Sequence, residues 1–89
     1  MIVEWRPEAL AALIEIFDYI DERNPQAAVA LLEDIEAATS ALPEHPYLYR
    51  FGRVPTTREI VVHPNYIVVD RVKDKIEVVN VLHSRRQYP

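Results

Sequence analysis

The sequence has 89 residues, of which 49% are hydrophobic and 27% are charged, so it is long enough for one small domain with a modest core. It contains no cysteine, which excludes disulfide bonds and zinc sites built from thiolates. The formal net charge is −4, and this acidic balance disfavours a general nucleic-acid-binding domain, because such domains are usually basic. We therefore expect a single domain over residues 1–89.

The chain begins with a pattern typical of a short strand and then a helix. The segment IVEW, residues 2–5, is rich in β-forming residues, and Pro7 suits the first position of a helix because its missing N–H has no helical partner. Apolar residues then recur at spacings of three and four, which predicts an amphipathic helix that ends near Arg23; they are Leu10, Leu13, Ile14, Phe17 and Ile20.

A second helix is predicted directly after the first. Asn24 can cap the free N–H groups of a helix, and Pro25 can occupy its first turn. The helix ends by Pro43, and its apolar stripe consists of Ala28, Leu31, Leu32, Ile35 and Ala38. Because the connection between the two helices is only a few residues long, we expect them to form an antiparallel hairpin.

The second half of the chain contains three apolar segments rich in β-branched residues. They span residues 58–63, 66–72 and 76–83, they follow an irregular connection, and turns of hairpin length separate them. The order strand, helix, helix, strand, strand, strand predicts an α+β fold. In this fold an N-terminal helical hairpin packs on a mostly antiparallel four-stranded sheet.

Both faces of this sheet are expected to be apolar, although two helices can cover only one of them. Ile67 and Val69 point to one face, whereas Tyr66 and Val68 point to the other. A partner chain could cover the second face, since an apolar patch on a small protein tends to mark an interaction surface. Alternatively, loop residues cover it, namely Tyr47, Leu48 and Phe51.

The helix periodicity also predicts a core between the hairpin and the sheet. The expected members are Leu13, Phe17, Leu31, Ile35, Val69 and Val81. On this helix phase, Phe17→Ala should cost about 3 to 5 kcal/mol of unfolding free energy.

The sequence carries no signal for a membrane, a metal or a cofactor. The N-terminal residues contain no basic region followed by an apolar run, and no stretch approaches about 18 consecutive apolar residues, which favours a cytoplasmic protein without a membrane segment. His45, His63 and His83 are 18 and 20 residues apart, which is not a metal-ligand spacing, and no glycine-rich phosphate loop is present. We therefore expect neither a metal nor a cofactor.

Charge is divided unevenly along the chain. Residues 1–43 carry nine acids against two arginines, whereas residues 44–89 carry five acids against eight basic residues. An acidic helical layer joined to a basic layer offers an anionic ligand only one attractive face.

The basic half contains the residues that could carry out chemistry. Arginine forms paired hydrogen bonds with phosphate, and histidine or tyrosine can transfer a proton or stack on a base. The candidates are Arg50, Arg53, Arg58, Tyr66, Arg71, His83, Arg85, Arg86 and Tyr88. The structural alternative is that these arginines are solvated or paired with nearby acids and that His83 only packs at a strand end.

Three stretches of the sequence resemble a known family. NPQAAVALLEDI, RFGRVPTTREIVVHPNYIVVDRV and IEVVNVLHSRRQYP look like the RelE/ParE superfamily, the toxin halves of bacterial type II toxin–antitoxin modules. The resemblance covers nearly the whole chain. It implies a fold like that of microbial ribonucleases, a cognate antitoxin, and growth arrest when the antitoxin is lost.

The superfamily contains two activities, and the sequence must be placed between them. RelE-type members cleave messenger RNA on the ribosome, whereas ParE-type members inhibit DNA gyrase. RelE-type enzymes typically carry an arginine just after the aromatic residue of the strand that reads YIVV here, and Ile67 occupies that position. An acidic chain is also poorly suited to docking among ribosomal phosphates. The sequence therefore favours a gyrase inhibitor, with a RelE-like ribosome-dependent endoribonuclease as the alternative and a non-toxic protein-binding domain as the third reading.

The two activities imply different roles for the C-terminal residues. If the chain is RelE-like, the resemblance assigns proton transfer to His83 or Tyr88. In either case Arg50, Arg53, Arg58, Arg85 and Arg86 are the expected contacts to the target or to phosphate. We expect the last strand to bring Arg85, Arg86 and Tyr88 to the rim of the sheet near Arg53 and Arg58; the alternative is a solvated tail that Tyr88 pins by packing.

Overall fold

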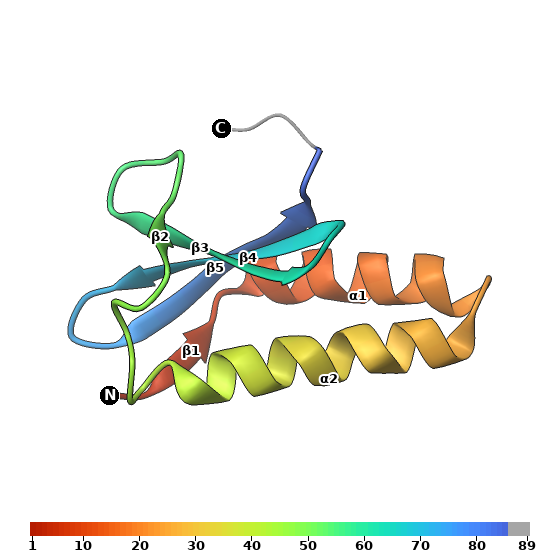
Figure 1. Ribbon diagram of the computed structural model, residues 1–89, viewed down its shortest axis with the longest axis horizontal. Coiled ribbons are helices and arrows are strands. Elements are labelled where there is room, and N and C mark those ends of the chain that lie inside the picture. Colours follow the sequence, from red (N-terminus) through yellow and green to blue (C-terminus); the bar gives the residue numbers. More distant parts are fainter. Residues whose placement is uncertain (86–89) are drawn as a thin grey trace.

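The computed structural model describes residues 1–85 and consists of a helical hairpin on one face of a mixed sheet (Figure 1). The elements are β1 (Val3–Trp5), α1 (Pro7–Asp21), α2 (Pro25–Ala41), β2 (Arg50–Phe51), β3 (Thr57–His63), β4 (Tyr66–Val72) and β5 (Ile76–His83). The strand order is β1-β5-β4-β3-β2, with β1 parallel to β5 and the other neighbours antiparallel. The predicted α+β fold is confirmed, and the structure adds β2, which makes the sheet five-stranded.

The signals that start the two helices act as expected. Pro7 and Pro25 each occupy the first turn of their helix. The Asn24 side chain caps α2 by accepting a hydrogen bond from the Ala27 N–H at 3.1 Å. No helix within residues 1–85 is both long and apolar enough to cross a membrane.

The main core lies between the hairpin and the sheet, but α1 is rotated from the predicted phase. Ala9 is its one fully buried residue, and Leu13, Ile16 and Ile20 pack against the core at partial burial. Leu10 and Ile14, which belong to the predicted apolar stripe, are exposed, so the stripe does not face the core as a whole. The reason is that α1 is apolar around most of its circumference, and the small alanines take the closest approach to the sheet. Phe17 is half-buried and lies outside the core.

The second face of the sheet carries a smaller apolar cluster. Ile67, Val69 and Leu82 are buried there, with Val79 packed against them. Val69 was therefore assigned to the wrong side, because alternation along β4 sends it away from the helices. The loop residues expected to cover this face do not, since Tyr47, Leu48 and Phe51 are all exposed. Cover by a partner chain stays a prediction.

Two neighbouring leucines of α2 test this arrangement. Leu31 is 4% exposed and belongs to the core, whereas Leu32 is 38% exposed on the other side of the same helix. Leu31→Ala should cost about 3 kcal/mol of unfolding free energy, because it leaves a cavity beneath the sheet, and Leu32→Ala should cost about 1 kcal/mol or less. Urea unfolding of both variants measures the difference. Equal losses for the two variants would contradict the observed helix phase.

Candidate functional site

Two arginines of the basic half converge on one buried carboxylate at the edge of the sheet. Arg50 of β2 is paired in register with Glu59 of β3, and its Nη2 lies 3.1 Å from Glu59 Oε1. The Arg53 backbone N–H donates to Glu59 Oε2 at 3.1 Å, and Arg53 Nε lies 3.6 Å from the same oxygen. The Glu59 side chain is 3% exposed, whereas the Arg50 and Arg53 side chains are 60% and 41% exposed. Glu59 thus fixes both arginines while they still face solvent.

The turn between β2 and β3 sets the position of Arg53. The Gly52 N–H donates to the Thr57 carbonyl oxygen at 2.8 Å, and the Thr57 hydroxyl donates to the Val54 carbonyl oxygen at 2.6 Å. A Cβ on Gly52 would lie 2.3 Å from Thr57 Oγ1, so this close approach requires glycine. Thr56 has a positive φ of 72°, which is unusual for a β-branched residue and strains the turn.

Arg58 lies on the opposite face of β3 from Glu59 and holds the segment that precedes and includes β2. Its guanidinium donates to the Tyr49 carbonyl oxygen at 2.8 Å and to that of Tyr47 at 3.4 Å. It also lies 4.4 Å from the centre of the Phe51 ring and 5.2 Å from that of Tyr47, which are cation–π distances. Arg58 therefore acts on its own chain rather than presenting its charge outward.

The same arginine is paired in register with an acid that is completely buried. Asp70 of β4 is 0% exposed, and neither of its carboxylate oxygens has a hydrogen-bond partner among the described residues. Burial raises the pKa of Asp70 to about 6, and the positive charge of Arg58 partly opposes that rise.

His83 lies at the other end of the sheet, next to the ring of Tyr66. Its ring centre is 5.3 Å from that of Tyr66, which is 5.8 Å from that of His63. His83 Nδ1 accepts a hydrogen bond from the Arg85 N–H at 3.1 Å. The His83 and Tyr66 side chains border an open cleft of about 210 Å³ against Glu15 and Ile16 of α1, so His83 faces the helices.

Arg85 does not lie near Arg53 and Arg58, contrary to the prediction that the last strand brings it there. The β5 residue level with Arg58, across Asp70, is Val78, five positions before His83. This separation corresponds to roughly 17 Å along a strand. Arg85 follows His83, and Ser84 is bonded to the turn at Pro64 and Asn65. Arg85 is thus at the far end from Arg58; Arg86 and Tyr88 lie outside the described residues.

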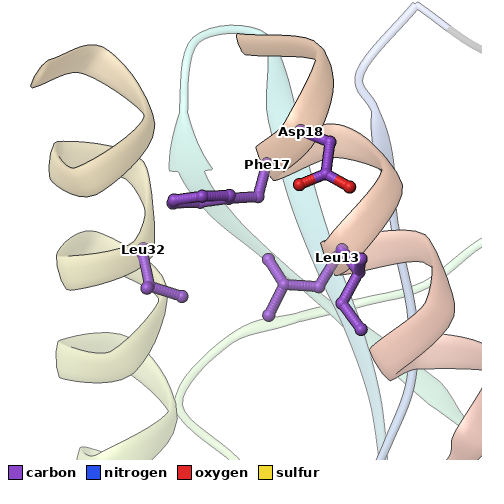
Figure 2. A pocket seen from close by; sticks show the side chains of 5 residues that line it. Leu13, Phe17, Asp18 and Leu32 are labelled. Atoms are coloured by element: carbon purple, nitrogen blue, oxygen red, sulfur yellow. The ribbon is translucent and has the colours of Figure 1, made fainter. Parts of the chain in front are cut away.

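A groove between the two helices is a second candidate surface, and two of its lining residues, Leu13 and Phe17, were predicted to lie in the core. It encloses about 250 Å³ and is lined by Leu13, Ile14, Phe17, Asp18 and Leu32. In Figure 2, Leu13 and Phe17 extend from α1 toward Leu32 of α2, and Asp18 lies beside them. In the sequence, this groove was indicated only by the apolar stripe of α1, which is wider than packing against the sheet requires.

Residues 1–85 contain no group of three or more histidine, aspartate or glutamate side chains that could hold a metal ion.

Comparison with known proteins gives a consistent set of relatives. The family model described as the ParE toxin of the type II toxin–antitoxin system parDE matches residues 3–88. A Sinorhizobium fredii protein named "Putative toxin Y4kP" is 36% identical over 88 residues, covering 98% of this chain and 92% of that protein. Toxin RelE2 of Caulobacter vibrioides is 35% identical over 85 residues, covering 94% and 96%.

Two solved structures share the fold. A chain of the chromosomal ParDE toxin–antitoxin system from P. aeruginosa superposes with a TM-score of 0.82 at 23% identity, over 93% of this chain and 95% of that chain. The YoeB dimer of Staphylococcus aureus gives a TM-score of 0.62 at 11% identity, over 99% and 98%. At these identities the likeness concerns the fold alone.

Asp70 should make the fold less stable as the pH rises. Its pKa is raised from 3.8 to about 6, so the folded chain binds this proton more tightly than the unfolded chain does. The contribution of Asp70 to stability is therefore fully present below pH 3.8 and is lost as the pH rises through about 6. Asp70→Asn, which cannot ionise, should gain about 3 kcal/mol relative to the wild type between about pH 4 and pH 7.

Urea unfolding at a series of pH values measures this difference. Asp74→Asn, in the exposed turn between β4 and β5, is the control and should follow the wild type across the range. Parallel pH profiles for Asp70→Asn and the wild type would show that Asp70 does not titrate in this way.

Proposed function

We propose that this chain, which belongs to the ParE toxin family of type II toxin–antitoxin systems, arrests bacterial growth by inhibiting DNA gyrase. It is the toxin component of such a module, within the RelE/ParE superfamily, and a cognate antitoxin is its partner. The observation that carries the choice of gyrase is that, within residues 1–85, His83 and the pair formed by Arg50 and Arg53 lie on opposite faces of the sheet.

A ribonuclease site needs a proton-transfer group and phosphate ligands within reach of the same phosphate. His83 faces the helices at one end of the sheet. Arg50 and Arg53 are held at the β2 edge by Glu59, which is paired with Val69 on the second face. The β5 residue level with Glu59 is Asn80, three positions before His83, which is roughly 10 Å along the strand. Because His83 and these arginines also lie on opposite faces of the sheet, they are not arranged around one phosphate.

The position after the aromatic residue of β4 supports the same choice. Ile67 stands where RelE-type enzymes typically carry an arginine, and it is fully buried in the apolar cluster of the second face. The chain as a whole carries a net charge of −4, which disfavours docking among ribosomal phosphates.

Ribosome-dependent cleavage of messenger RNA is the second candidate function. It is supported by the contact between His83 and Tyr66 and by the relative named Toxin RelE2. In this alternative His83 transfers the proton through Nε2, because its Nδ1 accepts the hydrogen bond from the Arg85 N–H. A non-toxic binding domain is the third candidate and predicts no growth arrest at all.

The groove between the helices is the surface that best suits the antitoxin. It is apolar and lies outside the sheet core, which suits the apolar face of an amphipathic segment laid along the hairpin. Asp18 on its wall and the surplus of acids on the two helices favour a segment with basic residues beside its apolar stripe. The groove is distinct from the second face of the sheet, which a partner chain could also cover and where Val61 is exposed.

The gyrase target can be tested with purified protein. The wild-type chain should inhibit gyrase-catalysed DNA supercoiling and should leave messenger RNA on programmed ribosomes intact. His83→Ala should retain the inhibition, because His83 lies on the opposite face of the sheet from the arginine pair. Ribosome-dependent RNA cleavage that His83→Ala lowers by roughly 100-fold would instead establish the RelE-like alternative. Inducing the wild type without any growth arrest would leave only the non-toxic domain.

The antitoxin surface can be tested with two matched charge insertions. Ile14 and Val61 are exposed to similar extents, at 59% and 56%, in the groove and on the second face respectively. Ile14→Glu should weaken antitoxin binding by roughly tenfold or more, because a carboxylate would be desolvated against an apolar and acidic groove, whereas Val61→Glu should bind normally. Calorimetric titration of each variant with the antitoxin measures the two affinities. The reverse order would assign the antitoxin to the second face.

A further inference from the structure

The segment from Tyr47 to Arg53 has the composition of a binding surface. Its exposed side chains, which we call the β2 rim, are Tyr47, Leu48, Arg50, Phe51 and Arg53. Aromatic residues and arginine are the types most enriched at the energetic centres of protein interfaces, and lysine and acids are depleted there. The seven residues YLYRFGR contain neither a lysine nor an acid.

The rim leaves unusually large apolar side chains in solvent. Phe51 is 79% exposed, Leu48 is 67% exposed and Tyr47 is 61% exposed, so none of these side chains packs into the fold. Neighbouring exposed side chains of this size on a small protein mark a surface that a partner covers. Figure 1 shows β2 and the turn after it projecting away from the helices, so the rim is separate from the interhelical groove.

The rim is also held rigid from both faces of the sheet. On one face, Glu59 fixes Arg50 and Arg53. On the other face, Arg58 bonds the carbonyl oxygens of Tyr47 and Tyr49 and stacks on the Phe51 ring. A surface whose side chains are already ordered loses little conformational entropy on binding, which favours affinity.

Charge and apolarity together indicate what the rim binds. Glu59 lies beneath the two arginines and is almost completely buried, so the outward-facing charge of the rim is positive in a chain that is acidic overall. A nucleic-acid surface would need several basic groups along a backbone, and Leu48 and Phe51 would find no apolar contact with phosphates. A protein surface with carboxylates around an apolar patch suits both features.

We propose that the β2 rim docks the toxin onto an acidic, partly apolar surface of its protein target, with Glu59 as the residue that positions Arg50 and Arg53. This inference rests on the proposed function in one respect, since it takes that target to be gyrase. It assigns target binding and antitoxin binding to different parts of the chain.

Matched substitutions test the rim. The chain offers a second exposed aromatic residue stacked by an arginine: the guanidinium of Arg23, which follows α1, lies 3.7 Å from the ring centre of Tyr19 of α1. Phe51→Ala and Arg50→Glu should each lower gyrase affinity and growth arrest by roughly tenfold or more, because they remove the apolar anchor and reverse the charge. Tyr19→Ala and Arg23→Glu, with the same chemistry elsewhere, should change neither. Arg50→Lys should retain part of the activity because it keeps the charge.

Two further measurements separate a docking role from a structural one. Phe51→Ala and Arg50→Glu should melt within a few degrees of the wild type and bind antitoxin with an affinity within about twofold of it. Glu59→Gln keeps the shape but not the charge that orients the arginines, so it should weaken gyrase binding and leave antitoxin binding unchanged. Rim variants with full affinity for gyrase and full toxicity would overturn the proposal.

These experiments also separate a failure of the rim proposal from a failure of the gyrase proposal. If the wild type does not inhibit gyrase, growth arrest still decides: its loss in the rim variants alone supports a docking surface for another protein, and its retention overturns the rim. If the rim variants instead lose ribosome-dependent RNA cleavage, the inference of a protein partner is wrong. If the wild type inhibits gyrase and the rim variants inhibit it equally, only the rim fails.

Discussion

Two consecutive residues of β3, Arg58 and Glu59, hold the edge of this sheet from opposite sides. Because successive side chains of a strand alternate between faces, these two neighbouring residues place a cation on one face and an anion on the other. Glu59 pairs with Arg50 and bonds the Arg53 backbone, while Arg58 bonds the carbonyl oxygens of Tyr47 and Tyr49. A strand of only two residues makes few ladder hydrogen bonds of its own, so these side-chain contacts keep β2 in place.

This arrangement buries charge, and buried charge is a poor way to increase stability. Removing a carboxylate from water costs several kcal/mol, and apolar residues of similar volume often stabilise a fold as well or better. Asp70 is the clearest case, since it is fully buried, lacks a hydrogen-bond partner in the described chain and has a raised pKa. What the charges provide is geometry: Asp70 places a negative charge beside Arg58 on the same face, and Arg58 orders the segment that carries Tyr47, Tyr49 and Phe51. The physical gain is a fixed surface rather than a more stable core.

The helices and strands could be predicted from the sequence, but the faces by which they pack against one another could not. Pro7 and the Asn24-Pro25 pair start the helices, and β-branched runs between polar turns mark β3 to β5, so the element order and most boundaries could be predicted. The phase of α1 could not, because apolar residues surround the helix and only packing on the sheet decides between Ala9 and Leu10. β2 is too short for a periodic signal.

The candidate site shows the same division between residue type and placement. The arginines could be recognised as functional candidates from their chemistry, but their grouping depends on strand register, which a sequence without long-range information does not define. Register puts Arg50 opposite Glu59 and Tyr66 opposite His83, at two ends of one sheet. The bulge between β4 and β5 at Val69 and Asp70 further decides which residues of β5 face the helices.

The separation of these positions bears on how one fold can serve two kinds of toxin. The sheet has two places where chemistry-bearing side chains meet: the aromatic and histidine end beside α1, and the arginine edge at β2. A nuclease must bring a proton-transfer group and phosphate ligands together at one place, whereas an inhibitor that acts by binding needs only a rigid, complementary surface. In this chain Arg50 and Arg53 are held at the β2 edge, and Ile67 is buried in the apolar cluster of the second face. A few residues on β3 and β4 can therefore determine whether such a sheet presents a rigid binding surface or the groups of a nuclease site.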